Sequence, residues 1–165
     1  MKGDALSREL RLGTAPMVRR RRRLIGLSLL SSASMGLISL YQVGIIKHLP
    51  EPPLRSFDAD KVDAAKEAYQ LFSMPDAVLG LGSYALTAAL AAMDGSDRAR
   101  ERPWLPLVLF GKVSLDAVAA AKLTVDQWKD HKAFCFWCLL AAAATFATVP
   151  LAVPEAREAL HRLQG

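Results

Sequence analysis

The chain has 165 residues, enough for one domain of ordinary size, and 52% of them are hydrophobic. It carries 21 Lys and Arg against 16 Asp and Glu, which gives a net charge of +5. The charges stand in blocks between long apolar stretches, whereas a nucleic-acid-binding domain spreads its basic residues over a folded surface. The composition therefore excludes a nucleic-acid partner and indicates a membrane protein.

Residues 1–23 are predicted to form a basic cytoplasmic tail that ends in five consecutive arginines, Arg19 to Arg23. An apolar stretch follows from residue 24 to about 46, and about 20 such residues are enough to cross a bilayer. Arginines before an apolar stretch also resemble a signal peptide. This stretch is longer than a signal core, and no small-residue cleavage site follows it. We therefore expect an uncleaved first span.

The segment between residues 47 and 75 has two parts. Its first part, KHLPEPPLRS, is rich in proline and cannot be helical. The second part predicts a short amphipathic helix, capped by Asp58 or Asp60. The apolar face of this helix would carry Val62, Ala65, Tyr69 and Phe72. The helix either covers the mouth of a helix bundle or belongs to a solvated connector, and the sequence leaves both open.

Three further apolar stretches run from about 76 to 93, 104 to 123 and 133 to 153. The stretch from 104 to 123, the third of the four in the chain, carries Lys112 and Asp116 in its interior. Ionisable groups at that depth are functional candidates, but a Lys and an Asp four residues apart can also neutralise each other. Both roles stay open. A soluble protein with four unusually apolar helices is the alternative to four membrane spans.

Arginine placement predicts the orientation of the spans. The arginine block before the first span, the loop DGSDRARERP and the C-terminal tail are all basic. The positive-inside rule places these three segments in the cytoplasm. Both termini are then cytoplasmic, and residues 47–75 and 124–132 lie outside. We expect an all-α, integral membrane four-helix bundle with a short amphipathic helix in the first outer loop.

The two cysteines of the chain, Cys135 and Cys138, lie at the start of the fourth span. Residues three apart share one face of a helix, and their separation suits a disulfide. The helix N-terminus and Lys132 would favour a thiolate at Cys135, and His131 could share its face. Cys135 is then expected to be the outer, more reachable sulfur, with Cys138 one turn deeper. This arrangement indicates a redox-active dithiol.

The cysteine pair has other interpretations. Two inert packing cysteines remain an alternative. A zinc site would need two more ligands, and His161 would lie on the opposite side of the membrane, so no metal is expected. A c-type haem requires His directly after the second cysteine, where Leu139 stands.

Over about residues 24–160, the sequence resembles the vitamin K epoxide reductase family of integral membrane thiol oxidoreductases. Four features carry the resemblance: four spans with the termini inside, a long first outer loop, MPDAVLGLGSY opening the second span, and CFWC at the outer start of the fourth. The segments FGKVSLDA and VPLAVPEAREAL are similar to those of bacterial members.

The resemblance implies a four-span domain around a quinone, either ubiquinone or menaquinone, in a bacterial inner membrane. Cys138 would face the quinone, which belongs to the membrane quinone pool, and Cys135 would exchange disulfides with a periplasmic thioredoxin-like thiol protein. Asp76 would lie near the quinone head group. The candidate supporting residues are His131, Lys132, Lys112 and Asp116.

Two departures from the family pattern bear on function. Family members carry a second cysteine pair in the first outer loop, but residues 47–75 contain no cysteine. Some members also carry a tyrosine where Ala142 stands here. The sequence predicts a quinone-linked thiol–disulfide oxidoreductase. The alternative is a non-catalytic membrane subunit that retains the fold and a quinone pocket.

Overall fold

The computed structural model describes residues 3–69 and 71–164, and these residues form helices and loops without a strand. The prediction of an all-α protein is confirmed. The α-helices are α1 (Gly3–Leu12), α2 (Pro16–Gln42), α3 (Ala59–Asp63), α4 (Asp76–Ala92), α5 (Arg98–Glu101), α6 (Trp104–Asp126) and α7 (Phe136–Gln164). Short 3₁₀ turns span Lys66–Tyr69 and Leu71–Ser73, and a π-helical turn spans Gln127–His131.

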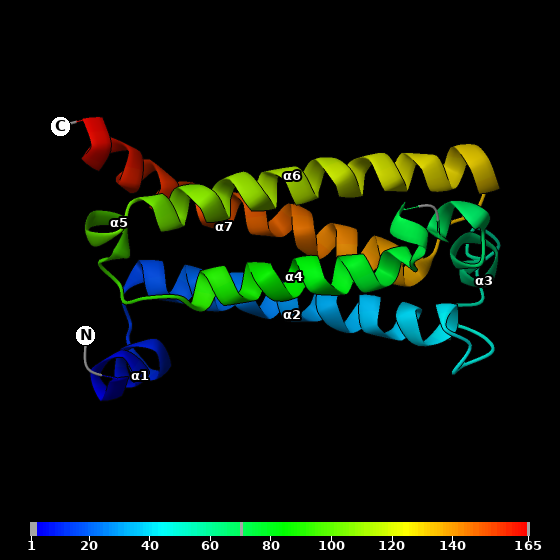
Figure 1. Cartoon of the computed structure of the whole chain (residues 1–165), viewed down its shortest axis with the longest axis horizontal. Helices are drawn as coiled ribbons and strands as arrows, with labels where there is room; N and C mark the ends of the chain where they lie inside the picture. The colour runs from blue at the N-terminus through cyan, green and yellow to red at the C-terminus, as the bar shows by residue number, and fades with distance from the viewer. Residues whose placement is uncertain (1–2, 70, 165) are drawn as a thin grey trace.

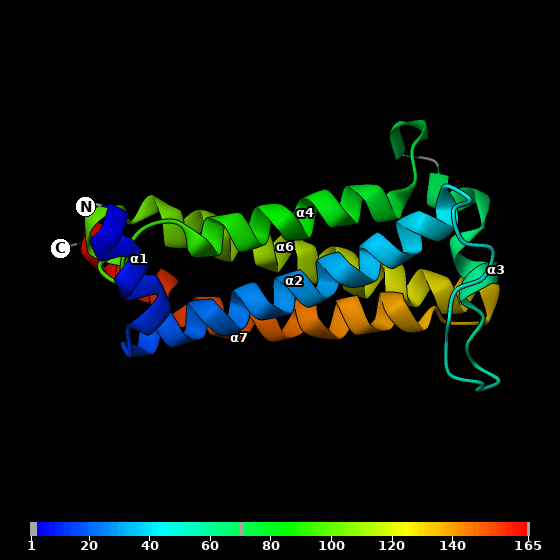
Figure 2. The ribbon, with the colours of Figure 1, turned by 90° about the horizontal axis from the view of Figure 1, so that it is seen from below.

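The four long helices α2, α4, α6 and α7 lie side by side in both views (Figure 1, Figure 2). Helix α2 packs against α4 and α7, and α7 also packs against α6. Both chain ends and α5 lie at one end of these helices, here called the termini end. Helix α3 and the start of α7 lie at the other end, here called the cysteine end.

Three of the long helices have the length and apolar composition needed to cross a membrane: α2, α7 and α6 with the π turn that continues it. Helix α4 is apolar but has only 17 residues. Large apolar side chains point away from the helix contacts, as expected of surfaces that face lipid: Leu29, Leu40, Leu86, Leu115, Val118 and Phe146 are exposed. The chain is therefore a multi-pass membrane protein.

Helix boundaries differ from the predicted spans in three places. Helix α2 begins at Pro16, a residue that fits the first helical turn because it lacks an N–H, so the arginine block is part of the helix. The helix ends at Gln42, four residues before the predicted limit, and Gly44 follows with a φ of 79°. Helix α7 continues to Gln164, beyond the predicted limit of the span at about residue 153, with Pro150 and Pro154 inside it.

Small side chains allow close contact at the interfaces of α2. Ser28, Ser31 and Ser34 are buried, and the Ser31 hydroxyl donates to the carbonyl oxygen of Ala141 on α7, 3.3 Å away. On α4, a Cβ added at Gly80 would lie 3.0 Å from the Met35 sulfur. Where lipid removes the hydrophobic drive between helices, such close approach supplies the packing energy.

A buried group of charges, here called the termini cluster, joins three helices at the termini end. It consists of Arg21 on α2, Arg98 on α5 and Glu155 on α7. The Arg98 side chain is 0% exposed, and its Nε and Nη2 donate to the two Glu155 carboxylate oxygens over 2.8 and 2.7 Å. Both arginines also donate to carbonyl oxygens that follow the last turn of α4, including that of Met93. Each charge therefore has a partner, which offsets the cost of burying it.

Lys112 and Asp116 form a second polar group, between α4 and α6. Their Nζ and Oδ2 atoms are 2.5 Å apart. Lys112 Nζ also donates to the Ser83 hydroxyl over 2.8 Å, and the hydroxyls of Ser83 and Thr87 donate to the Asp116 carboxylate. These contacts satisfy both charges and favour the structural role over a functional one.

Candidate functional site

The first loop crosses directly over the segment that carries the cysteines. Phe134 N–H donates to the carbonyl oxygen of Ser56 over 2.8 Å, and Asp58 N–H donates to that of Phe134 over 3.1 Å. The indole N–H of Trp137 donates to the Pro50 carbonyl oxygen over 2.6 Å. Residues 49–58, here called the strap, are thereby fixed onto the start of α7.

Helix α3 continues from the strap and is shorter than the sequence predicts. The Asp58 side chain caps it by accepting from Lys61 N–H over 3.0 Å. The helix ends at Asp63, and Phe72, which was expected on its apolar face, is 81% exposed with a φ of 55°. Asp63, which does not belong to the predicted apolar face, is buried together with Val62. The pattern misled because this turn of helix directs a carboxylate inward.

Cys135 is the residue before the first turn of α7, and its sulfur takes part in starting that helix. Cys138 N–H donates to the Cys135 sulfur over 3.2 Å, and Leu139 N–H donates to the Cys135 carbonyl oxygen over 3.0 Å. Cys135 N–H in turn donates to the Gln127 side-chain oxygen over 3.0 Å. Both cysteines are free thiols, held close together by the local helix geometry.

Access to the two sulfurs is the reverse of the prediction. Cys135 is 0% exposed, because the strap and the segment before α7 cover it. Cys138 is partly exposed and lines a cavity. The expectation that Cys135 would be the more reachable sulfur is therefore wrong in this conformation. Sequence position alone placed Cys135 outermost and gave no indication of the strap above it.

Asp63 is the charged side chain in contact with the cysteine pair. Its Oδ1 lies 3.6 Å from the Cys138 sulfur, and ligand atoms of Asp63, Cys135 and Cys138 all lie within 4.8 Å of one another. The carboxyl is only 3% exposed, and its Oδ2 has no hydrogen-bond partner among the described residues. Burial raises the pKa of Asp63 to about 7, although hydrogen bonds from the two thiols act in the opposite direction.

Lys132, which was predicted to favour a thiolate at Cys135, has its amino group near Trp128. Lys132 has a left-handed backbone, with φ of 54°, and its Nζ lies 6.0 Å from the centre of the Trp128 ring. His131 lines the cavity, and its carbonyl oxygen accepts from Lys61 Nζ. The charge in contact with the thiols is thus an anion. An anionic neighbour disfavours a thiolate, contrary to the expectation for Cys135.

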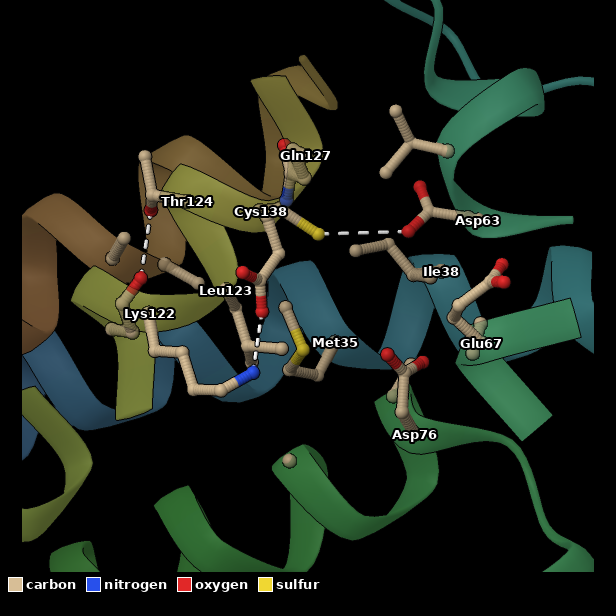
Figure 3. A pocket seen from close by; sticks show the side chains of 18 of the residues that line it. Met35, Ile38, Asp63, Glu67, Asp76, Lys122, Leu123, Thr124, Gln127 and Cys138 are labelled. Carbon is tan, nitrogen blue, oxygen red and sulfur yellow. Dashed lines mark hydrogen bonds and ion pairs between the residues drawn. The ribbon is translucent and has the colours of Figure 1, made fainter. Parts of the chain in front are cut away.

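A cavity of about 530 Å³ lies between the four long helices at the cysteine end (Figure 3). It is lined by Met35 and Ile38 of α2, Gly80 and Tyr84 of α4, Leu123 of α6 and Cys138 of α7. In Figure 3 the Cys138 sulfur points across the cavity toward Asp63. The volume is typical of a site for a small organic molecule, and the lining combines apolar side chains with polar and charged ones.

Asp76 lines the same cavity as Cys138, so the structure brings together two residues that the sequence singled out. Asp76 begins α4, and its Oδ1 accepts from Gln42 Nε2 over 2.8 Å. Gln42 Nε2 also lies 3.2 Å from the Asp63 carbonyl oxygen, so one amide joins α2, α3 and α4. Lys112 and Asp116 are absent from the cavity lining.

Three residues of the site carried no recognisable signal in the sequence. Asp63 and Gln42 are ordinary polar residues near helix ends, and Tyr84 is one aromatic residue in an apolar span. Tyr84 lines the cavity together with Ala142, and its phenol oxygen accepts from the Thr145 hydroxyl over 3.2 Å. The cavity therefore has a tyrosine from α4, although α7 carries alanine at position 142.

The donor set of Asp63, Cys135 and Cys138 is the group that comes closest to a metal site. Structural zinc is held by four ligands in a tetrahedral arrangement. Within residues 3–69 and 71–164, no fourth Cys, His, Asp or Glu joins these three. The group offers two thiols and one carboxyl, a set that suits proton and electron exchange.

Comparison with known proteins gives one match. A family model described as "Vitamin K epoxide reductase family" matches residues 22–153, which include both cysteines, Asp63 and the cavity lining. No curated protein and no solved structure matches the chain.

Proposed function

Because this chain belongs to the vitamin K epoxide reductase family, whose members are membrane thiol–disulfide oxidoreductases linked to quinones, we propose that it passes electrons from a thiol partner to a quinone through Cys135 and Cys138. One observation carries the proposal. The Cys138 sulfur lies on the wall of a cavity between the four long helices, next to Cys135 across the first turn of α7.

The cavity fits a quinone in size and chemistry. Its volume of about 530 Å³ lies within the range of small-molecule sites, and Met35, Ile38 and Leu123 provide an apolar lining. Bound there, a quinone of the membrane pool, ubiquinone or menaquinone, would supply an acceptor for two electrons and two protons. Asp76 and Tyr84 offer polar groups that orient a head group beside Cys138.

The thiol half of the cycle begins with the oxidised pair. A thiolate of a partner dithiol attacks Cys135 of the Cys135–Cys138 disulfide, forming a mixed disulfide and releasing the Cys138 thiolate. The second partner thiol then attacks the mixed disulfide and frees Cys135. The partner leaves as a disulfide, and the pair holds the two electrons as a dithiol.

The absence of cysteines in residues 47–75 means that no internal relay separates the partner from Cys135. The strap covers Cys135, so the partner has to displace residues 49–58 to reach the sulfur. A thioredoxin-like thiol protein, which presents its cysteines on an exposed loop, is the proposed partner.

The proposed setting is a bacterial inner membrane. Residues 24–160 form the four-span domain, with α4 as its shortest span, and residues 1–23 form the basic cytoplasmic tail. The excess of arginine at the termini end supports cytoplasmic termini. The strap, α3 and the cysteines then face the periplasm, where disulfides persist.

A non-catalytic membrane subunit is the second candidate function. The missing loop cysteines and the full burial of Cys135 favour it. Such a protein would keep the fold and the cavity, while its two cysteines would serve packing alone.

Reduction of a soluble quinone by dithiothreitol, followed by quinone absorbance, separates the two candidates. The purified full-length protein in detergent is expected to accelerate the reaction, whereas Cys138→Ser and Cys135→Ser proteins stay at the uncatalysed rate. Equal rates for all three proteins would support the non-catalytic subunit.

Covalent trapping tests the order of the two cysteines. In the reverse direction, reduced Cys135 attacks the disulfide of an oxidised thioredoxin-like protein, and Cys138 resolves the mixed disulfide that forms. Cys138→Ser cannot resolve it and is therefore expected to accumulate an adduct with the oxidised thioredoxin-like protein on a non-reducing gel, while Cys135→Ser does not. Adducts at Cys138 in place of Cys135 would reverse the assigned roles.

A further inference from the structure

We infer that Asp63 is the proton acceptor for the Cys138 thiol, a catalytic role that rests on the proposed function and adds a residue of the first loop to it. In place of a thiol, that loop brings a carboxylate to the redox pair. The inference concerns the step in which the dithiol is oxidised.

The contact geometry supports this role. Asp63 Oδ1 lies 3.6 Å from the Cys138 sulfur, a distance at which a thiol donates a weak hydrogen bond to a carboxylate. Its other oxygen, Oδ2, is buried without a partner among the described residues. A buried carboxylate with an unused oxygen loses an unfavourable buried charge when it binds a proton.

Other ionisable groups near the pair are engaged elsewhere. Asp76 accepts from Gln42, Glu51 accepts from Ala59 N–H, and Lys61 donates to the His131 carbonyl oxygen. Glu67 lines the cavity with an exposed side chain and has no hydrogen bond with either thiol among the described contacts. Asp63 is the one carboxyl among these that touches a sulfur.

The step balances in protons and electrons. The Cys138 S–H bond breaks, its proton passes to Asp63 Oδ1, and the sulfur facing the cavity becomes a thiolate. As the bond between the two sulfurs forms, the Cys135 S–H bond breaks, and its proton passes to the quinone with the two electrons that leave the pair. Asp63 returns to the carboxylate by releasing its proton toward the cavity, so both protons accompany the two electrons.

The surroundings tune Asp63 to exchange protons near neutral pH. Burial raises the pKa of Asp63 to about 7, and the carboxylates of Asp76 and Glu51 act in the same direction. A general base works best when its pKa lies near the working pH. An ordinary surface carboxyl would bind the thiol proton too weakly at neutral pH to serve as its acceptor.

The test combines thiol chemistry with turnover. Reduced full-length protein in detergent is alkylated with iodoacetamide from pH 5 to 10, and modification of Cys138 is followed by peptide mass spectrometry. We expect the wild-type rate to rise in two steps, the lower with a midpoint of about 7 set by Asp63. Asp63→Asn should lose the lower step, Asp63→Glu should retain one, and Asp97→Asn, which changes an exposed carboxyl at the termini end, should match the wild type.

The second measurement of the test is quinone reduction driven by dithiothreitol. Loss of a general base typically costs roughly 10²-fold or more, so Asp63→Asn should fall by about that factor while Asp97→Asn does not change. An Asp63→Asn protein that keeps either the lower alkylation step or wild-type turnover overturns the inference, as does a wild type without the lower step. A wild type that does not reduce quinone defeats the proposed function instead, and alkylation still decides whether Asp63 and Cys138 share a proton.

Discussion

Charge is buried at both ends of the four long helices, but its surroundings differ between the two ends. In the termini cluster, Arg98 and Glu155 meet through two hydrogen bonds, and Arg21 lies 3.8 Å from the same carboxylate. At the cysteine end, the buried Asp63 has two thiols as neighbours and an oxygen without a described partner.

The termini cluster is suited to holding the fold together, whereas the surroundings of Asp63 are suited to exchanging protons. A buried carboxylate between arginines stays ionised, and removing one partner leaves an uncompensated charge. A buried carboxyl beside neutral thiols changes protonation near neutral pH, as perturbed groups in active sites do. We therefore expect changes at the termini end to affect stability, and changes at the cysteine end to affect pH dependence and chemistry.

The largest expected difference between the two ends is the side of the membrane from which each can be labelled. In a background without native cysteines, a thiol reagent that cannot cross the membrane should label Lys66→Cys at the cysteine end in intact spheroplasts. It should label Asp97→Cys at the termini end only after lysis. Both positions are exposed, so access depends on the side of the membrane. The opposite pattern would invert the orientation and place the redox pair in the cytoplasm.

Arg98→Met should be the most destabilising substitution. It leaves Glu155 buried with Arg21 alone and removes the hydrogen bonds to carbonyl oxygens at the end of α4, a loss of about 3–5 kcal/mol in unfolding free energy. Thermal unfolding in detergent measures this loss of stability.

Arg100→Met is the matched control for Arg98→Met. Arg100 pairs with Glu158 through an exposed side chain, and exposed pairs contribute less than about 1 kcal/mol. Equal losses for the two variants would mean that the termini cluster is no more important than a surface pair.

Asp63→Asn should instead stabilise the protein, in a way that depends on pH. The folded-state pKa of Asp63 is raised from 3.8 to about 7, so the wild type loses stability as pH rises between these values. At pH 8 the variant should be more stable by roughly 2–4 kcal/mol, and at pH 4 the difference should vanish. A gain that is the same at both pH values would show that Asp63 does not titrate in this range.

Lys112→Met should have a smaller effect than Arg98→Met or Asp63→Asn. Asp116 keeps the hydroxyls of Ser83 and Thr87 as donors, so the loss should be about 1–2 kcal/mol, with thiol alkylation unchanged. Lys122→Met, which removes an exposed pair with Asp126 four residues away, should cost less still. Altered alkylation in Lys112→Met would return Lys112 to the candidate supporting residues.

Long, continuous apolar stretches made much of the fold predictable. The helices around residues 24–46, 76–93, 104–123 and 133–153 follow from unbroken apolar stretches, and the family was indicated by CFWC with its flanking segments. Helix ends were less predictable, because they depend on individual residues such as Pro16 and Gly44.

The site was only partly predictable for a physical reason. Cys135, Cys138 and Asp76 could be selected because they are chemically unusual in apolar surroundings. Asp63 and the strap reach the pair through contacts between segments more than 70 positions apart in the chain, such as Asp63 with Cys138. No local pattern records such contacts, so the burial of Cys135 and its anionic neighbour could be learned only from the structure.

A single-turnover experiment tests the central claim most directly. Reduced full-length protein, freed of dithiothreitol, is mixed with one equivalent of quinone, and quinol is measured by absorbance while the Cys135–Cys138 peptide is examined under non-reducing conditions. We predict one quinol and one internal disulfide per chain. Persistence of the dithiol beside unreduced quinone would contradict the proposed electron path.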